Sequence, residues 1–332
     1  MRYAIVGAGA IGAYVGASLV RAGAEVVLIA RGPHLTAMRR SGLRVISGQR
    51  ESTVAPGCTD TCRDVGPVDV VIIALKAHQI GGMLEQIGHL VRPDTLIVSM
   101  QNGVPWWYFQ RHGGPLDGHT LESVDPGGRL AHAFDPANVV GCAVYSSAEM
   151  VAPGVVRHIE GTRYTLGHPG GEITRRLERV AADFRAGGLK APIVANVRGD
   201  VWTKLLGNVC FNPLSALTRS TLGELAGDAL VAPTVRAMMS ETLAVAARLG
   251  ITIDVSIERR IDGARRVGDH KTSTLQDIEA GRPLEVDSII GAVVELGDLL
   301  GVDVSTTRQV YGLTKMLDRA TQRGQEQFAI AV

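Results

Sequence analysis

The N-terminal end of the chain constrains the fold more than any other part of the sequence. Tyr3–Val6 is a short apolar run that predicts a buried strand, and the residues up to Gly23 predict a helix behind it. Between them lies a GxGxxG pattern. Its first glycine makes a tight turn, its second lets the backbone approach a pyrophosphate, and its third lets helix and strand pack closely. The pattern predicts a dinucleotide-binding domain of Rossmann type, with cofactor contacts from Gly7, Gly9, Ala10, Ile11 and Gly12.

The residue after the second predicted strand indicates which dinucleotide is bound. That strand, Glu25–Ala30, ends at Arg31, and the next carboxylate along the chain is Glu51. A site selective for NAD would place Asp or Glu here to bind the ribose 2′-hydroxyl, whereas a guanidinium suits a 2′-phosphate. We therefore expect NADP(H), bound in part by Arg31. The alternative is that Arg31 is a solvated loop residue.

Two further buried strands end at polar residues. The apolar runs Val68–Leu75 and Thr95–Met100 are followed by Lys76 and by Gln101-Asn102-Gly103. Ligands of open parallel sheets bind at the carboxyl ends of the strands, so Lys76 and Asn102 are expected beside the same cofactor. Asn-Gly is also a common turn dipeptide, which is the alternative interpretation of Asn102.

A row of polar residues interrupts an otherwise apolar helical segment, Asp200–Leu217. Lys204, Asn208 and Asn212 are spaced by four, which places them within an arc of roughly 80° on one helix face. Buried polar groups need partners, so the row either meets a polar network or lines a pocket.

From about Arg198 the apolar spacing becomes helical, with predicted helices at 202–217, 229–250, 257–267, 288–300 and 306–322. We therefore expect an α/β protein with a Rossmann-type parallel sheet domain at 1–195 and an all-helical substrate domain at 196–332, with a cleft between them. Glu285 stands at the start of one of these helices. It is interpreted either as satisfying the helix N-terminus or as a partner of Lys204 or of a substrate hydroxyl.

The segment from Pro105 to Pro136 is rich in Gly and Pro and contains the aromatic cluster Trp106-Trp107-Tyr108-Phe109. It is predicted to be a lid or an oligomer contact, or alternatively a local core under a long loop. Three short antiparallel strands, at 139–150, 154–161 and 162–167, are expected to complete the sheet.

Composition excludes several classes of protein. The chain has 332 residues and a formal net charge of +1, with no basic block, so nucleic acid is not an expected partner. The four cysteines form no CxxC pair, and we expect reduced thiols and no metal site. The uncharged run 3–20 resembles a signal peptide, but its glycines favour a nucleotide-binding strand and helix. The expected location is the cytoplasm, with no membrane contact.

Together these segments resemble the ketopantoate reductase (2-dehydropantoate 2-reductase) family. The resemblance rests on GAGAIG, Arg31, ALKAHQ, SMQNG, WTKLLGNVCFNPLSAL and TSTLQDIEAGRPLEVD, which run from end to end of the chain. It implies NADPH-dependent reduction of a 2-oxo acid, most of all 2-dehydropantoate. Lys204 would be the general acid and Glu285 a second catalytic residue. The implied substrate contacts are Asn102, Asn208, Asn212 and Ser273, and Arg31 and Lys76 would hold NADP(H).

One position departs from the family pattern. The family usually has an asparagine that contacts substrate shortly before Gly-Glu-Leu, whereas this chain has Leu222 there. A reductase of a different, more apolar 2-oxo acid therefore stays open as an alternative, as does a non-catalytic NADPH-binding regulator. The sequence leaves a homodimer open as well.

Overall fold

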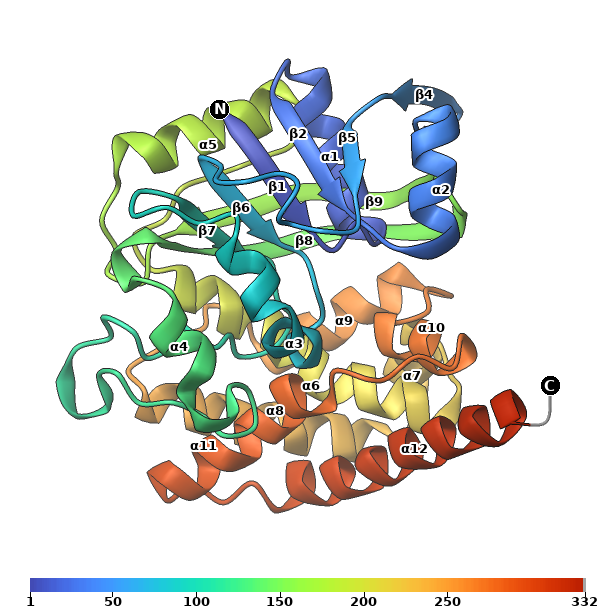
Figure 1. The fold of residues 1–332 in the computed structure, drawn as a ribbon. Helices are drawn as coiled ribbons and strands as arrows, with labels where there is room; N and C mark the ends of the chain where they lie inside the picture. Colours follow the sequence, from blue (N-terminus) through green and yellow to red (C-terminus); the bar gives the residue numbers. More distant parts are fainter. Residues whose placement is uncertain (331–332) are drawn as a thin grey trace. The chain divides into compact units, whose positions relative to one another are not determined.

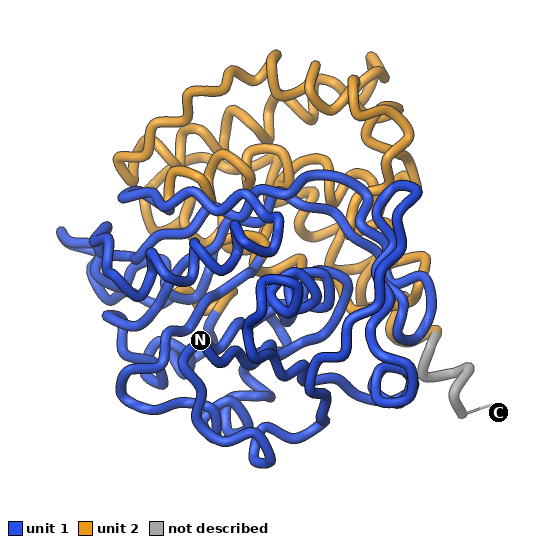
Figure 2. The backbone as a smooth tube through the Cα atoms, turned by 90° about the horizontal axis from the view of Figure 1, so that it is seen from above, with its two compact units in different colours: residues 1–101, 105–120, 125–197 blue, residues 102–104, 121–124, 198–332 orange. Residues whose placement is uncertain are grey.

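The structure is a computed structural model that describes residues 1–330, with the side chains of residues 1–324. Residues 331 and 332, the end of the predicted helical domain, lie outside the described residues. The chain forms two compact units, shown in Figure 2. Unit 1 comprises Met1–Gln101, Pro105–Thr120 and Asp125–Val197. Unit 2 comprises Asn102–Val104, Leu121–Val124 and Arg198–Val332. The two short pieces that join unit 2 were not anticipated from the sequence.

Unit 1 is built on a nine-stranded sheet with the order β4-β3-β9-β8-β7-β6-β1-β2-β5 (Figure 1). Its strands are β1 (Arg2–Val6), β2 (Glu25–Ile29), β3 (Leu43–Ser47), β4 (Arg50–Val54), β5 (Gly57–Thr59), β6 (Val70–Ile73), β7 (Leu96–Ser99), β8 (Val139–Ala152) and β9 (Val155–Gly167). The run from β5 to β8 is parallel throughout. Only the pairs β3–β4 and β8–β9 are antiparallel among the strands described. The prediction of a Rossmann-type sheet is confirmed.

Of the three short antiparallel strands expected here, the antiparallel pairing is confirmed between β8 and β9, but the division into three short strands is wrong. The first of them, β8, pairs parallel with β7, and the other two form one long strand, β9. Gly161 explains the error, because it lies at φ +71° where the β8–β9 register shifts, and a Cβ there would stand 2.2 Å from the Tyr145 carbonyl oxygen. A glycine at a bulge resembles a strand end in sequence.

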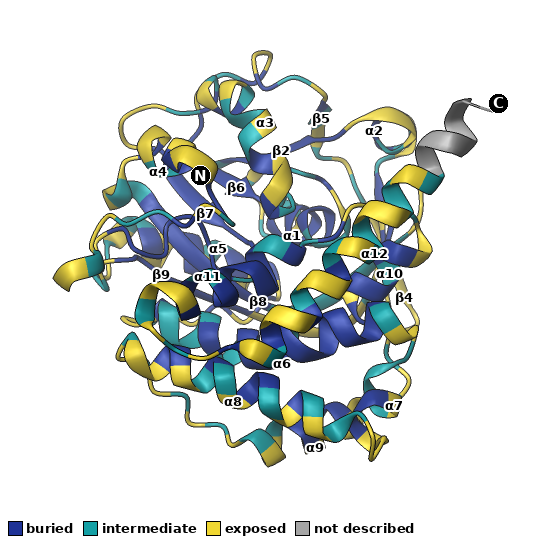
Figure 3. Cartoon of the chain, turned by 90° about the horizontal axis from the view of Figure 1, so that it is seen from below, coloured by how far each residue is buried: buried dark blue, intermediate teal, exposed yellow. Residues whose placement is uncertain are grey.

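Helices cover the sheet of unit 1. They are α1 (Ala10–Arg21), α2 (Gly32–Ser41), α3 (Ala77–Gly88), α4 (Arg129–Ala133) and α5 (Arg175–Ala186), with 3₁₀ turns η1 (Gly114–Leu116), η2 (Pro126–Gly128) and η3 (Pro136–Asn138). Helices α1 and α5 contact each other, and both lie against β9. The resulting core is continuous from the first strand to Phe184 and Leu189, and Figure 3 shows strands β6 and β7 as buried.

The aromatic cluster after β7 is a local core. Trp106, Trp107, Tyr108 and Phe109 are all buried. The ring of Trp107 packs so closely on Gly141 of β8 that a Cβ at that glycine would lie 2.4 Å from it. Of the two interpretations of this segment, burial under a long loop is confirmed, because these rings cover the sheet rather than face solvent.

Unit 2 is helical. Its helices are α6 (Val197–Thr218), α7 (Leu222–Gly227), α8 (Ala232–Arg248), α9 (Ile257–Val267), α10 (Ser273–Glu279), α11 (Ala292–Leu300) and α12 (Ser305–Ile330), with one π-helical turn, η4 (Asp287–Gly291), leading into α11. The five predicted helices are all present, while α7 and α10 were not predicted. No helix in the described part of the chain is long and apolar enough to span a membrane.

Two pieces of chain from the N-terminal half belong to unit 2. The backbone amide of Val104 donates to the Ser288 carbonyl at 2.8 Å. The amides of Glu122 and Ser123 donate to the carboxylate of Glu295, at 2.8 and 2.9 Å. Unit 2 is therefore a helical body completed by two short segments from before residue 125.

Candidate functional site

The first group of predicted residues lies along one edge of the parallel sheet. Val6 at the end of β1 pairs with Ile29 at the end of β2 and with Ile73 at the end of β6. The residues that follow these strands therefore leave the sheet side by side. They are Gly7 with the glycine loop, Arg31 before α2, and Lys76 before α3. The strand register thus brings the predicted cofactor residues to one edge of unit 1.

The glycine loop fits a dinucleotide. Gly7 has φ +99°, and a Cβ at Gly12 would lie 2.1 Å from the Gly7 carbonyl oxygen, so both positions require glycine. Gly9 differs, because a Cβ built on it meets nothing within 4 Å. Space is therefore open in front of the second glycine, where a pyrophosphate would approach. The first turn of α1 carries no acidic residue and no side-chain cap, which suits an anion.

The two basic residues at this edge stand at helix starts. Arg31 is exposed and is the N-cap of α2, and Lys76 is the N-cap of α3 and is half-buried. Both positions let a long cationic side chain reach phosphate groups at the sheet edge without burial of the charge.

His34 is a residue of this edge that the sequence analysis missed. Its Nδ1 accepts the backbone amide of Gly154 at 2.9 Å, which leaves Nε2 as the protonated nitrogen. Nε2 is buried and makes no hydrogen bond of good geometry within the described residues, although a weaker interaction with the Ala8 backbone reaches the ring. Burial lowers the pKa of His34, so a neutral ring is favoured. His34 follows Arg31 by three residues in the first turn of α2, a proximity that the pattern RGPH could have indicated.

The second group centres on Lys204 of α6. Its Nζ donates to Oδ1 of Asn102 at 2.5 Å, and both residues belong to unit 2. Asn102 stands three residues after Ser99, the last residue of β7. The polar segment that ends this strand therefore binds the ammonium group directly. The contact brings Asn102 and Lys204 together, and their shared role in one substrate site stays a prediction.

The turn after Asn102 is built for close approach. Gly103 has φ +80°, and a Cβ there would lie 2.0 Å from the Ser288 carbonyl oxygen in η4. The next amide, Val104, donates to that same carbonyl. Asn-Gly is therefore a turn whose glycine approaches the π-helical turn closely, and the functional role of Asn102 stays a prediction.

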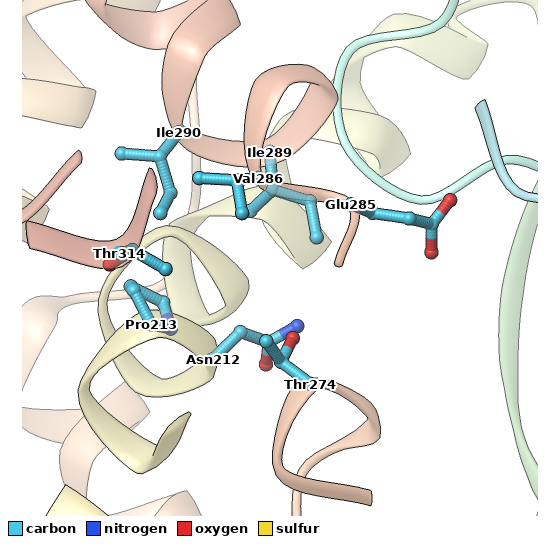
Figure 4. A pocket seen from close by; sticks show the side chains of 8 residues that line it. All are labelled: Asn212, Pro213, Thr274, Glu285, Val286, Ile289, Ile290 and Thr314. Carbon is cyan, nitrogen blue, oxygen red and sulfur yellow. The ribbon is translucent and has the colours of Figure 1, made fainter. Parts of the chain in front are cut away.

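A small cavity lies further along α6 (Figure 4). Its lining residues come from α6, α10, α12 and the segment around η4: Asn212, Pro213, Thr274, Glu285, Val286, Ile289, Ile290 and Thr314. Its volume of ≈ 10 Å³ holds about one water-sized group. Figure 4 shows Asn212 and Thr274 side by side, with the Glu285 carboxylate extending away from the apolar side chains. The cavity therefore brings Asn212 and Glu285 to one region, with Thr274 as a polar residue that the sequence analysis missed.

The remaining predicted residues lie outside this cavity lining. Asn208 is half-buried on α6, one turn from Lys204. Ser273 is exposed and begins α10, next to the N-cap Thr272, whose side chain accepts the Leu275 amide. Leu222 begins α7, and its amide donates to the His270 carbonyl at 3.0 Å. Their roles toward a substrate stay predictions.

Comparisons with known proteins agree in both halves of the chain. The family profile described as "Ketopantoate reductase PanE/ApbA" matches residues 3–106, and "Ketopantoate reductase PanE/ApbA C terminal" matches residues 196–318. A 2-dehydropantoate 2-reductase of Mesorhizobium japonicum is 44% identical over 98% of this chain and 99% of its own. The solved structure of a candidate ketopantoate reductase from Ralstonia solanacearum is 39% identical, with a TM-score of 0.91, covering 96% of this chain and 98% of that one. A PanE/ApbA family ketopantoate reductase from Ralstonia eutropha is 30% identical, with a TM-score of 0.82, covering 97% and 100%.

Proposed function

The chain belongs to the ketopantoate reductase family and is an NADP-dependent oxidoreductase, and from this premise we propose that it reduces 2-dehydropantoate to pantoate. The observation that carries the proposal for this chain's own residues is the contact between Lys204 Nζ and Asn102 Oδ1. An amine held at a fixed point by a neutral amide is suited to protonate an oxygen. Family membership sets aside the alternative of a non-catalytic regulator.

We propose that Lys204 is the general acid. When bound, NADPH supplies the hydride for the carbonyl carbon of the substrate. The ammonium group of Lys204 stabilises the negative charge that develops on the carbonyl oxygen and gives it a proton. Asn102 orients that ammonium through its amide oxygen, which keeps one N–H occupied and directs the others.

On the cofactor side, the residues that would hold NADPH are those of the unit 1 edge. The backbone of Gly7, Gly9, Ala10, Ile11 and Gly12 would bind the pyrophosphate, supported by the open space at Gly9. Arg31 would bind the 2′-phosphate, and Lys76 would stand on the NADP side of the site. Asn102, which follows β7, is proposed to contact both cofactor and substrate.

On the substrate side, the carboxamides of Asn208 and Asn212 are proposed to bind the carboxylate and hydroxyl groups of the substrate, with Ser273 as a further contact. Glu285 is proposed as the second catalytic residue, one that holds the substrate hydroxyl. The shared cavity of Asn212 and Glu285 supports their assignment to one region. The exposed position of Ser273 makes it the least supported of these contacts.

A second candidate substrate is a more apolar 2-oxo acid, and the observation that supports it is the presence of Leu222 where the family usually has an asparagine. If Leu222 occupies the place of a carboxamide, one hydrogen bond to the polar end of 2-dehydropantoate is lost, and the pocket discriminates less strongly.

The test is NADPH oxidation by the purified protein over a panel of 2-oxo acids that includes 2-dehydropantoate and 2-oxoisovalerate. We expect the highest kcat/KM with 2-dehydropantoate. The other 2-oxo acids should have kcat/KM values that fall as their structures differ more from 2-dehydropantoate. Absence of NADPH oxidation with every 2-oxo acid would contradict the proposal, and a clear preference for 2-oxoisovalerate would establish the second candidate.

The finer assignments of location and assembly, a cytoplasmic homodimer, belong to the same proposal. The four cysteines form no disulfide, as in proteins of reducing compartments, and three of them, Cys62, Cys142 and Cys210, are buried. Light scattering coupled to size exclusion tests the dimer, and fractionation of the native cell tests the location.

A further inference from the structure

One face of α12 carries polar residues that all contact the same short segment. Tyr311, Lys315 and Asp318 are spaced by four and three, which places them in a row on the helix. The Tyr311 hydroxyl donates to Oδ1 of Asp287 at 2.7 Å, and Lys315 Nζ donates to Oδ2 of the same carboxylate at 2.8 Å. Oδ1 of Asp318 accepts the backbone amide of Leu284 at 3.1 Å.

These contacts fall on either side of Glu285. Leu284 precedes it and Asp287 follows it by two residues, so the backbone is held before and after the proposed catalytic carboxylate. Thr314 of α12 lies on the same helix face as these three residues. It is buried and lines the same cavity as Glu285. Figure 4 shows Thr314 and Glu285 on different walls of that cavity.

The contacts also reach the π-helical turn. A Cβ on Gly291, at the end of η4, would lie 3.1 Å from the ring of Tyr311, so this glycine lets the tyrosine ring approach the turn closely. Within η4, the Ser288 carbonyl accepts the amide of Val104, two residues after Asn102. The same turn therefore connects α12 to Glu285 on one side and to the Asn102 segment on the other. Such turns are frequent at functional sites.

The contacts of Tyr311 and Lys315 with Asp287 are expected to persist across the physiological pH range. Burial, and then the hydrogen bond to Asp287, raise the pKa of Tyr311, so its hydroxyl remains a donor at any physiological pH. The side chain of Lys315 is 26% exposed and that of Asp287 is 42% exposed, so this pair is less screened than the pair Arg308–Asp298 from the same helix, at 48% and 65%.

We propose that Tyr311, Lys315 and Asp318 form a clamp on α12 that positions Glu285 and, through η4, the Asn102 that orients Lys204. These three are positioning residues and touch no reacting atom. The inference rests on the proposed function, because it assigns the clamp a purpose only if Glu285 and Asn102 act on the substrate.

The test uses substitutions that remove one polar contact and keep the shape of the helix, Tyr311→Phe and Lys315→Met. Each is expected to lower kcat/KM for 2-dehydropantoate by about 5- to 20-fold, less than the full worth of a hydrogen bond to a charged group, because the clamp acts on the reaction only through other residues. NADPH affinity should stay within about twofold, because the cofactor residues of unit 1 are untouched. The matched control, Arg308→Met, removes an ion pair from the same helix to Asp298 and should leave kcat/KM unchanged.

A double-mutant cycle separates positioning from simple destabilisation. In a Glu285→Gln background, Tyr311→Phe should cost less than its loss of about 5- to 20-fold in the unmodified protein, because the clamp then has only the Asn102 segment left to position. Fully additive losses would overturn the proposal, as would an equal loss in Arg308→Met. Lys315→Met serves as the second variant if Tyr311→Phe fails to fold.

Amide hydrogen exchange gives a readout that does not depend on the reaction. The segment 284–291 should exchange faster in Tyr311→Phe and in Lys315→Met, and unchanged in Arg308→Met. If the exchange is unaltered in the clamp variants, the clamp is refuted whatever the activity. If exchange rises as expected while Glu285→Gln turns over normally, the clamp exists but does not position a catalytic carboxylate, which overturns the inference and the role of Glu285 together and leaves NADPH-dependent reduction untouched.

Discussion

The cofactor edge of unit 1 and the polar row of unit 2 are built by different means. At the edge, the essential features are backbone features: the turn at Gly7, the open space at Gly9 and the free first turn of α1. In unit 2 the essential features are side chains gathered from distant segments, with Lys204 on α6 and Asn102 after β7 in direct contact. A phosphate can be bound by any backbone with the right turn, whereas a proton must be delivered by one particular group. Substitutions in the two regions should therefore fail in different ways.

The largest effect is expected at Lys204. Lys204→Ala should lower kcat by about 10²–10⁴-fold, the usual range for a lost general acid, and leave folding and NADPH binding intact. Steady-state kinetics, NADPH fluorescence titration and thermal unfolding check the three parts. Lys190→Ala, at an exposed lysine of unit 1, is the matched control and should behave as wild type. Normal turnover by Lys204→Ala would make this residue structural.

The cofactor edge should respond in binding rather than in rate. Arg31→Ala removes a charge-assisted pair to the 2′-phosphate and should weaken NADPH binding by about 1.5–3 kcal/mol, with little change for NADH. Titration of the two cofactors measures this, with Arg40→Ala, another exposed arginine of α2, as control. Equal affinity of the unmodified protein for NADPH and NADH would rule out the role given to Arg31.

Replacing one glycine of each region by alanine separates an effect on cofactor binding from an effect on stability. Gly9→Ala should fold normally, since Gly9 has φ −68° and open space around it, but should lose NADPH affinity by about tenfold, or ~1.4 kcal/mol. Gly103→Ala should destabilise the fold by about 1–3 kcal/mol from its positive φ alone, before its overlap with the Ser288 carbonyl is counted. Chemical denaturation and NADPH titration of both variants distinguish them. If Gly9→Ala and Gly103→Ala change stability and NADPH affinity equally, the distinction between the open space at Gly9 and the filled space at Gly103 is refuted.

The smallest effect is expected at Leu222. Leu222→Asn would add one neutral hydrogen bond, worth about 0.5–1.5 kcal/mol, and should shift the ratio of kcat/KM toward 2-dehydropantoate and away from 2-oxoisovalerate. Both ratios are measured in the two proteins. If the unmodified enzyme already strongly prefers 2-dehydropantoate and the substitution changes nothing, Leu222 lies outside the substrate pocket.

The two regions also differ in how far the sequence predicts them. The glycine loop was predictable because its spacing is local, and strand register then carries Arg31 and Lys76 to the same edge. The Lys204–Asn208–Asn212 row was predictable as a helix face. The place of Thr274 in the same cavity as Asn212 was not, because α10 was not recognised as a helix. Nor could local pattern show that Gly103 meets Ser288, 185 positions along the chain, since only the tertiary fold sets that contact. The aromatic cluster illustrates the same limit, because composition does not reveal that Trp107 covers Gly141.

The central claim is that cofactor binding and proton delivery are separable properties of this enzyme. The most direct test measures the dissociation constant of NADPH and the single-turnover rate with 2-dehydropantoate side by side in Gly9→Ala and Lys204→Ala. We expect Gly9→Ala to bind NADPH more weakly and, once saturated with cofactor, to react at close to the unmodified rate. We expect Lys204→Ala to bind NADPH normally and to react about 10²–10⁴-fold more slowly. A loss of NADPH affinity in Lys204→Ala as large as that in Gly9→Ala, or a normal single-turnover rate in Lys204→Ala, would contradict the account.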